Sequence, residues 1–217
     1  MLAWNTAINL TAIRDPVAIA VRHVVDSLTA VRPLRERGVT ELLDLGSGGG
    51  FPGLPLGAAI PATRTLLLES IAKKATFLEA AVTAAGLTDR VAVRAARAEA
   101  LAADSDDRER WPAVTARAVG DLVELVELGF PLLRPGGVLV AWKRGDLAAE
   151  LRTAYHAVDV LGGGELEVLG VRATGLEGHV LVLVTKRGRT PRGYPRDRAA
   201  RHRRGRSGPL TGPGDGC

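Results

Sequence analysis

The stretch Leu42-Leu43-Asp44-Leu45-Gly46-Ser47-Gly48-Gly49-Gly50-Phe51-Pro52-Gly53 decides the fold of this chain. It begins as an apolar run, which is typical of a buried strand, and continues as a glycine-rich loop. Glycine allows the sharp turn of such a loop and leaves room for a ligand where another residue would place a Cβ atom. In open α/β sheets, ligands bind at the carboxyl ends of the strands, so this loop indicates a ligand site.

Strand and helix patterns alternate around this loop, which predicts an α/β fold. We expect a Rossmann-like architecture with a seven-stranded, mostly parallel sheet and helices on both faces. The predicted strands are 41–45, 65–69, 91–94, 113–117, 138–142, 165–169 and 179–185, of which the last two form an antiparallel pair. The predicted helices are 54–60, 72–85 and 121–133. A further helix begins at Asp15-Pro16 and carries an apolar stripe as far as Leu28.

The length of 217 residues suits one domain with a full core. We expect residues 1–186 to form this domain, with a helical cap at 1–38, and residues 187–217 to lack packed structure because they are rich in Gly, Pro and Arg. From Lys186 onward, ten basic residues face two acidic ones, a net charge of +8, whereas the rest of the chain carries −3. The basic end predicts a polyanionic partner, either nucleic acid or anionic lipid, and a solvated end without a partner is the alternative.

The composition excludes several classes of protein. The single cysteine, Cys217, excludes an intrachain disulfide and any multi-cysteine zinc site. No apolar run approaches the ~20 residues of a membrane-spanning helix, and the first residues lack the pattern of a secretory signal. We therefore expect a cytoplasmic protein without a metal site.

The glycine loop and the next strand together indicate a nucleotide-like cofactor. Gly46, Gly48 and Gly50 are the candidates for close approach of the ligand. Glu69 ends the next predicted strand, 25 positions after Asp44, and its carboxylate can accept hydrogen bonds from two ribose hydroxyls. Both dinucleotides and S-adenosylmethionine contain such a ribose, so the pattern leaves two classes of cofactor open.

A nicotinamide-dependent oxidoreductase is the first alternative, because residues 48–53 fit G-x-G-x-x-G. The carboxylate of Asp44 counts against it, since it would repel a pyrophosphate, and no Tyr-x-x-x-Lys motif is present. S-adenosylmethionine carries an ammonium and a sulfonium group, which suit nearby carboxylates. The residues therefore favour a class I S-adenosylmethionine-dependent methyltransferase. A binding module that keeps the pocket without catalysis is the second alternative.

Several stretches outside the glycine loop add a more specific signal. They are Trp4-Asn5 with 9–16, then 22–28, 73–78, 117–118, 142–145 and 190–196. Together with residues 44–55, they resemble the RsmG (GidB) family of ribosomal RNA methyltransferases. The resemblance extends from residue 4 to about residue 196, and its specificity comes from the combination of stretches.

The resemblance implies transfer of a methyl group from S-adenosylmethionine to N7 of guanine 527 in bacterial 16S ribosomal RNA. The implied partner is this RNA or a precursor of the small ribosomal subunit, met in the cytoplasm by a monomer without a membrane partner. The implied cofactor contacts are Gly46, Phe51, Ala98, Glu99 and Arg117. The family also has a longer helical segment ahead of Trp4-Asn5, so the cap is expected to be shortened.

Guanine N7 has a free lone pair at neutral pH, so it attacks the methyl group without prior removal of a proton. Catalysis should then rest on positioning, and no catalytic residue is assigned; the candidates are His23, Asp26 and Lys143. His23 and Asp26 lie three positions apart, on one helical face. Contact with the guanine and a hydrogen bond that only packs the helix are both open for them.

The methylated base is cationic, so we expect basic residues to hold phosphates rather than crowd the methyl group. The candidates for RNA binding are Arg14, Arg22, Lys73, Lys74, Lys143, Arg192 and Arg196. Solvated surface charges are the alternative interpretation of these residues. Arg117 follows a predicted buried strand, where a cation needs a partner, and we expect it to pair with Asp44 or Glu69.

Overall fold

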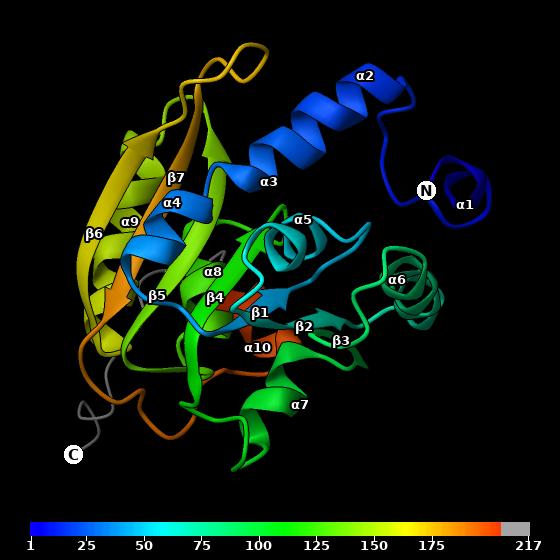
Figure 1. Cartoon of the computed structure of the whole chain (residues 1–217). Coiled ribbons are helices and arrows are strands. Elements are labelled where there is room, and N and C mark those ends of the chain that lie inside the picture. The colour runs from blue at the N-terminus through cyan, green and yellow to red at the C-terminus, as the bar shows by residue number, and fades with distance from the viewer. Residues whose placement is uncertain (205–217) are drawn as a thin grey trace, which may run out of the picture.

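Two strands at the centre of the sheet, β1 (Glu41–Leu45) and β4 (Trp111–Arg117), are buried along almost their whole length. The computed structural model describes residues 1–204 and orders the sheet as β3-β2-β1-β4-β5-β7-β6 (Figure 1). The remaining strands are β2 (Arg64–Glu69), β3 (Val91–Ala95), β5 (Leu133–Arg144), β6 (Gly163–Gly170) and β7 (His179–Lys186). Strands β1 to β5 run parallel, and β7 is antiparallel to both of its neighbours. The predicted fold class is confirmed.

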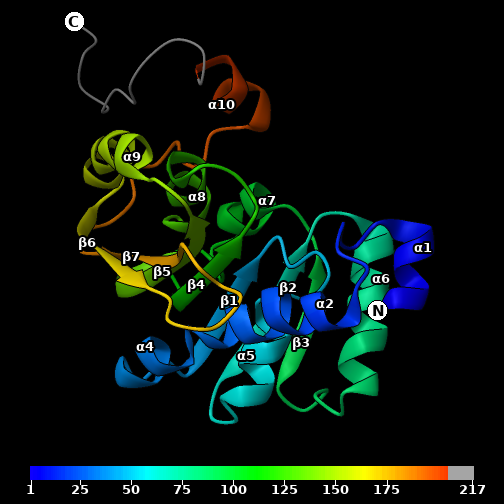
Figure 2. The same cartoon turned by 90° about the horizontal axis from the view of Figure 1, so that it is seen from above.

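Helices cover both faces of the sheet (Figure 2). One face carries α4 (Val31–Glu36), α5 (Gly53–Ala59) and α6 (Ala72–Ala84), and the other carries α7 (Ala98–Ala103), α8 (Leu122–Gly129) and α9 (Ala148–Val160). Helix α1 (Leu2–Ile8) packs outside α6, where the rings of Trp4 and Phe77 meet edge to face at 5.7 Å. The sheet is thus enclosed between two helical layers.

The strand order reverses between β1 and β4. From β1 the chain continues outward to β2 and β3, whereas β4 leads to β5 on the other side. The carboxyl ends of β1 and β4 therefore border the crevice in which open α/β sheets bind their ligands. The glycine loop leaves β1 at this crevice, and Arg117 ends β4 beside it.

The predicted helix from Pro16 to Leu28 is present, as α2 (Pro16–Ile19), a π-helical segment η1 (Ala20–Val25) and α3 (Asp26–Leu28). The Asp15 carboxylate caps its start by accepting a hydrogen bond from the Ala18 N–H at 2.6 Å. Figure 1 shows this helix, in blue, extending from the top of the sheet toward α1. Short π-helical segments are frequent at functional sites, and this one carries His23.

Two features of the central region differ from the prediction. The helix predicted over 121–133 ends at Gly129, because Leu133 already pairs with Trp111 in the sheet and the chain must be extended there. Helices α7 and α9 were not predicted. Helix α9 has alanine at many positions, which weakens the apolar stripe that would identify it in the sequence.

The expectation that residues 187–217 lack packed structure is wrong for residues 187–204, named here the C-terminal segment. Thr190 is buried, and α10 (Arg198–Arg204) follows. The physical reason is pairing: the Arg196 guanidinium binds the Glu127 carboxylate, which is only 1% exposed and needs a cation. Residues 205–217 lie outside the described residues, so the expectation for them stays a prediction.

Candidate functional site

The loop after β1 depends on glycine for its backbone conformation. Gly46, Gly48 and Gly50 all have positive φ angles, of 70°, 54° and 90°. A Cβ atom on Gly46 would lie 2.7 Å from Cγ2 of Val119, so no larger residue fits there without rearrangement. The N–H groups of Gly46 and Ser47 both donate to the Leu68 carbonyl at the end of β2, which holds the loop against the neighbouring strand.

Asp44 is fully buried beneath this loop. Its carboxylate accepts hydrogen bonds from the Thr115 hydroxyl at 2.8 Å and from the Gly53 N–H at 3.1 Å. Burial raises the pKa of Asp44 to about 6, although these hydrogen bonds oppose the shift. Asp44 therefore ties β4 to the start of α5 and shapes the loop from below.

Glu69 supports the same loop from the end of β2. One carboxylate oxygen accepts from the Gly48 N–H at 2.9 Å and the other from the Ile71 N–H at 2.8 Å. The side chain is 5% exposed. Each oxygen keeps a second lone pair, but the two observed hydrogen bonds fix the carboxylate as a brace of the backbone.

A cavity of about 400 Å³ lies beside the loop on the face that carries α7 and α8. Ligand pockets in proteins have volumes of this order. Its walls include Gly46, Ala98, Glu99, Val119, Arg198 and Arg201. Of the predicted cofactor residues, Gly46, Ala98 and Glu99 thus border one cavity, and we call it the cofactor cavity below. Two arginines of α10, Arg198 and Arg201, border it as well, which the sequence did not indicate.

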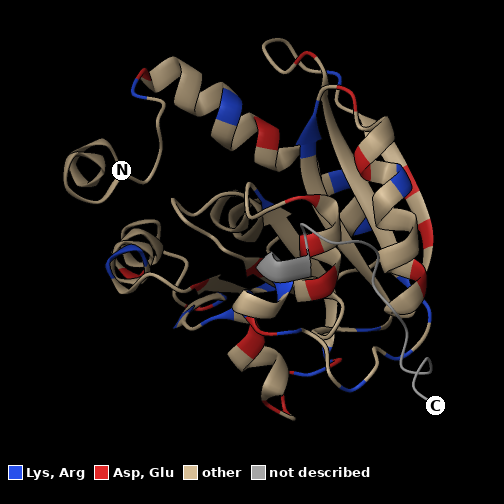
Figure 3. Ribbon diagram, turned by 180° about the vertical axis from the view of Figure 1, so that it is seen from behind, with Lys and Arg blue, Asp and Glu red and all other residues tan. Residues whose placement is uncertain are grey.

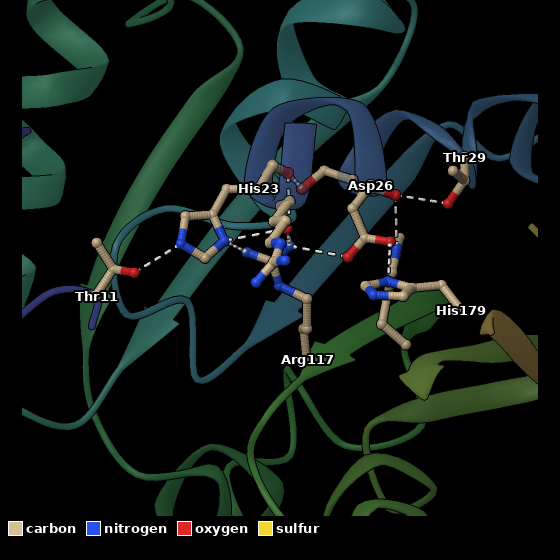
Figure 4. Close-up of polar contacts among 9 residues, drawn as sticks. Thr11, His23, Asp26, Thr29, Arg117 and His179 are labelled. Carbon is tan, nitrogen blue, oxygen red and sulfur yellow. Dashed lines mark hydrogen bonds and ion pairs between the residues drawn. The ribbon is translucent and has the colours of Figure 1, made fainter. Parts of the chain in front are cut away.

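A second group of polar side chains lies where the N-terminal helix meets β4 (Figure 4). It comprises Thr11, His23, Asp26, Arg117 and His179, and we call it the Arg117 cluster. Arg117 pairs with Asp26 at 3.2 Å and donates to the carbonyl of Arg22 at 3.2 Å. Asp26, whose side chain is 3% exposed, also contacts Nδ1 of His179 at 3.0 Å. The predicted pairing of Arg117 with Asp44 or Glu69 is therefore wrong, because Asp26 is the partner in contact.

His23 links this cluster to the glycine loop. Its ring stacks on Phe51 with centroids 5.0 Å apart, and the Arg117 guanidinium lies 5.4 Å from the same Phe51 ring. Burial and the charge of Arg117 lower the pKa of His23, so the imidazole is neutral at pH 7. Nδ1 of His23 lies 3.2 Å from both the Arg117 guanidinium and the Arg22 carbonyl, and Nε2 lies 2.7 Å from the Thr11 hydroxyl. Arginine can only donate, so the contact with Arg117 uses the tautomer in which Nδ1 accepts and Nε2 donates to Thr11, whereas the contact with the Arg22 carbonyl uses the other tautomer.

Comparison with known proteins identifies the family of this chain. The family model described as rRNA small subunit methyltransferase G matches residues 1–179. The chain belongs to this family. A relative named ribosomal RNA small subunit methyltransferase G, from Roseiflexus sp. (strain RS-1), is 43% identical over 194 residues, which is 89% of this chain and 82% of the relative. A relative of the same name from Rubrobacter xylanophilus is 41% identical over 99% of this chain and 82% of its own length.

Solved structures with the same fold include two methyltransferases. A SAM-dependent O-methyltransferase from Thermotoga maritima aligns with a TM-score of 0.61 and 16% identity, covering 88% of this chain and 72% of that one. An O-methyltransferase from Bacillus cereus in complex with SAH aligns with a TM-score of 0.60 and 20% identity, covering 85% and 88%. At this identity the likeness concerns the fold, which is the class I methyltransferase fold with its Rossmann-like sheet.

The predicted cofactor-binding and catalytic residues do not all lie together in the structure. Gly46, Ala98 and Glu99 border the cofactor cavity. Gly48 and Gly50 belong to the loop beside it, and Glu69 supports this loop from the end of β2. Phe51 and Arg117 belong with His23 and Asp26, on the side of the N-terminal helix. Lys143, a candidate for both catalysis and RNA binding, is bound to Glu150 at 2.6 Å and to the Gly120 carbonyl at 2.9 Å. Its ammonium therefore already has two protein partners.

The other candidates for RNA binding divide by exposure. Arg14, Arg22, Lys73 and Arg192 are exposed, and Lys74 is partly so. Arg196 is held by Glu127 and is 17% exposed, so its charge is largely neutralised within the protein. Figure 3 shows that basic and acidic residues are interspersed over the domain rather than separated into two faces.

Sequence reasoning missed three residues at this site. His179 reaches Asp26 from β7, across 153 positions of sequence, and Arg201 reaches Glu99 across 102. Such long-range pairs leave no spacing pattern in a single sequence. Glu150, the partner of Lys143, lies in the first turn of α9, which was not predicted. Within residues 1–204, no helix is long and apolar enough to span a membrane, and no group of three or more His, Cys, Asp or Glu side chains could hold a metal ion.

Proposed function

We propose that this chain transfers a methyl group from S-adenosylmethionine to N7 of a guanine in 16S ribosomal RNA. The observation that carries the proposal is the glycine loop and its cavity at the crevice between β1 and β4, in a chain of the rRNA small subunit methyltransferase G family. Two buried carboxylates support this geometry: Asp44 accepts from the Gly53 N–H and Glu69 accepts from the Gly48 N–H.

The residues present fit the cofactor. Gly46 lines the cavity and presents no Cβ atom to a ligand, and the cavity has the volume expected of a small-molecule site. We propose that Gly46, Ala98 and Glu99 hold the nucleoside part, with Phe51 and Arg117 nearer the reacting group. When bound, the cofactor supplies a methyl group attached to a positively charged sulfur, which the base lone pair can attack directly.

The Arg117 cluster suits a reaction that creates a cationic base. Asp26 pairs with Arg117 and so neutralises its charge. His23 is uncharged, because its pKa is lowered by burial and by Arg117. A base placed beside Phe51 would therefore meet little net positive charge while its N7 gains one. No protein group needs to accept a proton in the transfer step, so positioning by these side chains is their whole contribution.

The substrate is proposed to be 16S ribosomal RNA or a precursor of the small ribosomal subunit, bound by a monomer in the cytoplasm. Exposed cations at Arg14, Arg22, Lys73 and Arg192 support it, since phosphate contacts supply a large share of the affinity for nucleic acids. The charges of Lys143 and Arg196 are already paired and are not part of this proposed surface.

The test is a methyl-transfer assay on small-subunit RNA that lacks the modification. We expect one methyl group per RNA, on guanine N7, and chain cleavage at that base after borohydride and aniline treatment. Methylation of a pyrimidine carbon or an exocyclic amine would contradict the proposal. Thermal melting separates the alternatives, because only a ligand of the native state raises the melting temperature. A shift with NAD and none with S-adenosylmethionine favours the oxidoreductase, and a shift with S-adenosylmethionine but no methyl transfer to any RNA favours the binding module.

A further inference from the structure

The C-terminal segment returns to the domain and is anchored at several points before α10 begins. The Thr190 N–H donates to the Glu109 carboxylate at 2.7 Å. The Arg108 guanidinium donates to three carbonyls of the segment, among them that of Tyr194 at 2.9 Å. Arg196 then binds Glu127. These contacts fix the direction in which α10 leaves, on the side of the sheet that carries α7 and α8 (Figure 2).

Helix α10 brings Arg201 into the wall of the cofactor cavity. The side chain of Arg201 is 8% exposed, and its guanidinium binds the Glu99 carboxylate at 2.5 Å. Its Nε atom lies 3.7 Å from the carboxylate of Glu124 and is buried without a hydrogen-bond partner. One arginine therefore stands between two carboxylates that border the same cavity, and it keeps one donor unused.

We propose that α10 forms part of the cofactor site. In this proposal Arg201 is a positioning residue, which holds the Glu99 carboxylate where it contacts the adenine of the cofactor. This inference rests on the proposed function. Arg201 donates to Oε1 of Glu99 and not to Oε2. A carboxylate only accepts hydrogen bonds, so Oε2 suits the 6-amino group of adenine and disfavours the 6-oxo group of a deaminated purine.

The planar guanidinium is needed because it can contact both carboxylates at once. Without it, Glu99 and Glu124 repel each other and turn toward water, and the adenine amino group loses a fixed acceptor. Lysine keeps the charge but offers no planar fork, so Arg201→Lys should restore binding only in part. Since a hydrogen bond to a charged group contributes about 1.5–3 kcal/mol, the loss of this arrangement should weaken binding of the adenosyl ligand about tenfold or more.

The experiment is isothermal titration of S-adenosylhomocysteine into the full chain and into variants. Arg201→Ala is the main variant, and a chain ending at Asp197 removes α10 while keeping the Arg196–Glu127 pair. Two matched controls retain Arg201: a chain ending at Arg204, which removes only residues outside the described structure, and Arg192→Ala, which removes an exposed arginine of the same segment that does not border the cavity. Circular dichroism checks that each variant is folded.

We expect both controls to bind like the full chain, and both Arg201→Ala and the chain ending at Asp197 to bind about tenfold more weakly. A second readout excludes a purely structural effect: S-inosylhomocysteine should bind the full chain much more weakly than S-adenosylhomocysteine, and Arg201→Ala should lose most of this preference. Equal affinity of Arg201→Ala and the full chain, or an unchanged preference, overturns the inference alone. Failure of the full chain to bind S-adenosylhomocysteine overturns the proposed function with it.

Discussion

Two largely buried arginines hold outer helices to this domain, and they do so in different ways. Arg117 belongs to the sheet and reaches outward to Asp26 in the N-terminal helix, where it also meets backbone carbonyls and His23. Arg201 belongs to the outer helix α10 and reaches inward to Glu99, with one N–H left unpaired. The carboxylate of Asp26 is 3% exposed, whereas that of Glu99 is 22% exposed.

The burial of the carboxylate decides what each arginine does. A carboxylate as buried as Asp26 cannot be rehydrated when its partner is lost, so the cost falls on the folded state. Glu99 is close enough to water to be rehydrated, so the loss of Arg201 changes its position more than the stability of the protein. We therefore expect Arg117 to act mainly on stability and Arg201 mainly on cofactor binding.

The largest effect is expected for Arg117→Ala. It should lower the free energy of unfolding by about 3 kcal/mol or more, because it leaves Asp26 buried with only His179 and backbone near it. Denaturation in urea measures this loss. The double variant Arg117→Ala/Asp26→Asn should recover at least about 1 kcal/mol relative to the sum of the two single changes. Additive losses would show that the pair is not coupled.

A third carboxylate, Asp44, extends the comparison to a group with no arginine in contact. Its folded-state pKa of about 6 lies above the ordinary value of 3.8, so the native state binds the proton more tightly than the unfolded chain. The corresponding stability is fully present below pH 3.8 and is lost as the pH rises through about 6. Between pH 4 and 7, this loss should amount to about 2 kcal/mol, because part of it has already occurred at pH 4.

The variant Asp44→Asn tests this pH dependence, because it cannot titrate. The difference in the free energy of unfolding between the original protein and Asp44→Asn should change by about 2 kcal/mol between pH 4 and 7, in favour of the original protein at the acidic end. Urea titrations at several pH values measure it. A constant difference over this range would mean that burial does not raise the pKa of Asp44.

The parts of the fold that follow a local pattern could be predicted from the sequence. Strands β1 to β5 could be predicted from their apolar runs. The glycine loop could be predicted from its closely spaced glycines, which adopt positive φ angles in the structure. Gly46 was identified as a contact on this basis, and it borders the cavity. The strands near the end of the chain and their antiparallel pairing were also predicted correctly.

The parts that depend on distant partners could not be predicted. The C-terminal segment has a composition typical of unpacked chain, yet its cations have partners in Glu127 and Glu99, whose positions no local pattern reveals. The predicted partner of Arg117 was wrong for the same reason. The sequence places Asp44 and Glu69 at the ends of neighbouring strands, but it does not show that the N-terminal helix brings Asp26 to Arg117. Long-range ion pairs follow from the complete fold, and a single sequence does not specify them locally.

A smaller effect on stability is expected on the α10 side. Arg201→Ala should lower the free energy of unfolding by less than about 1 kcal/mol at pH 7, since Glu99 retains access to water. Burial raises the pKa of Glu99, but the hydrogen bond and charge of Arg201 outweigh it, so the pKa lies below its ordinary 4.5. This pair therefore stabilises the protein above pH 4.5 and loses that contribution as the pH falls. In urea titrations, the stability of Glu99→Gln should accordingly fall less at acidic pH than that of the original protein. If Arg201→Ala loses as much free energy of unfolding as Arg117→Ala, the two arginines do not differ in the way proposed.

The smallest effect on stability is expected where arginines of the C-terminal segment have no buried carboxylate to hold. Arg187, Arg189 and Arg192 are exposed, so their replacement by alanine should change the free energy of unfolding by less than about 0.5 kcal/mol.

Each phosphate contact contributes roughly −0.7 to −0.9 to the slope of log affinity against log salt. If the three arginines contact RNA, the triple variant should bind it with a slope shallower by about two units. Arg196→Ala is the contrasting variant: it should destabilise the protein through Glu127 and leave the slope nearly unchanged. An unaltered slope in the triple variant would assign the phosphate contacts to Arg14, Arg22 and Lys73 instead.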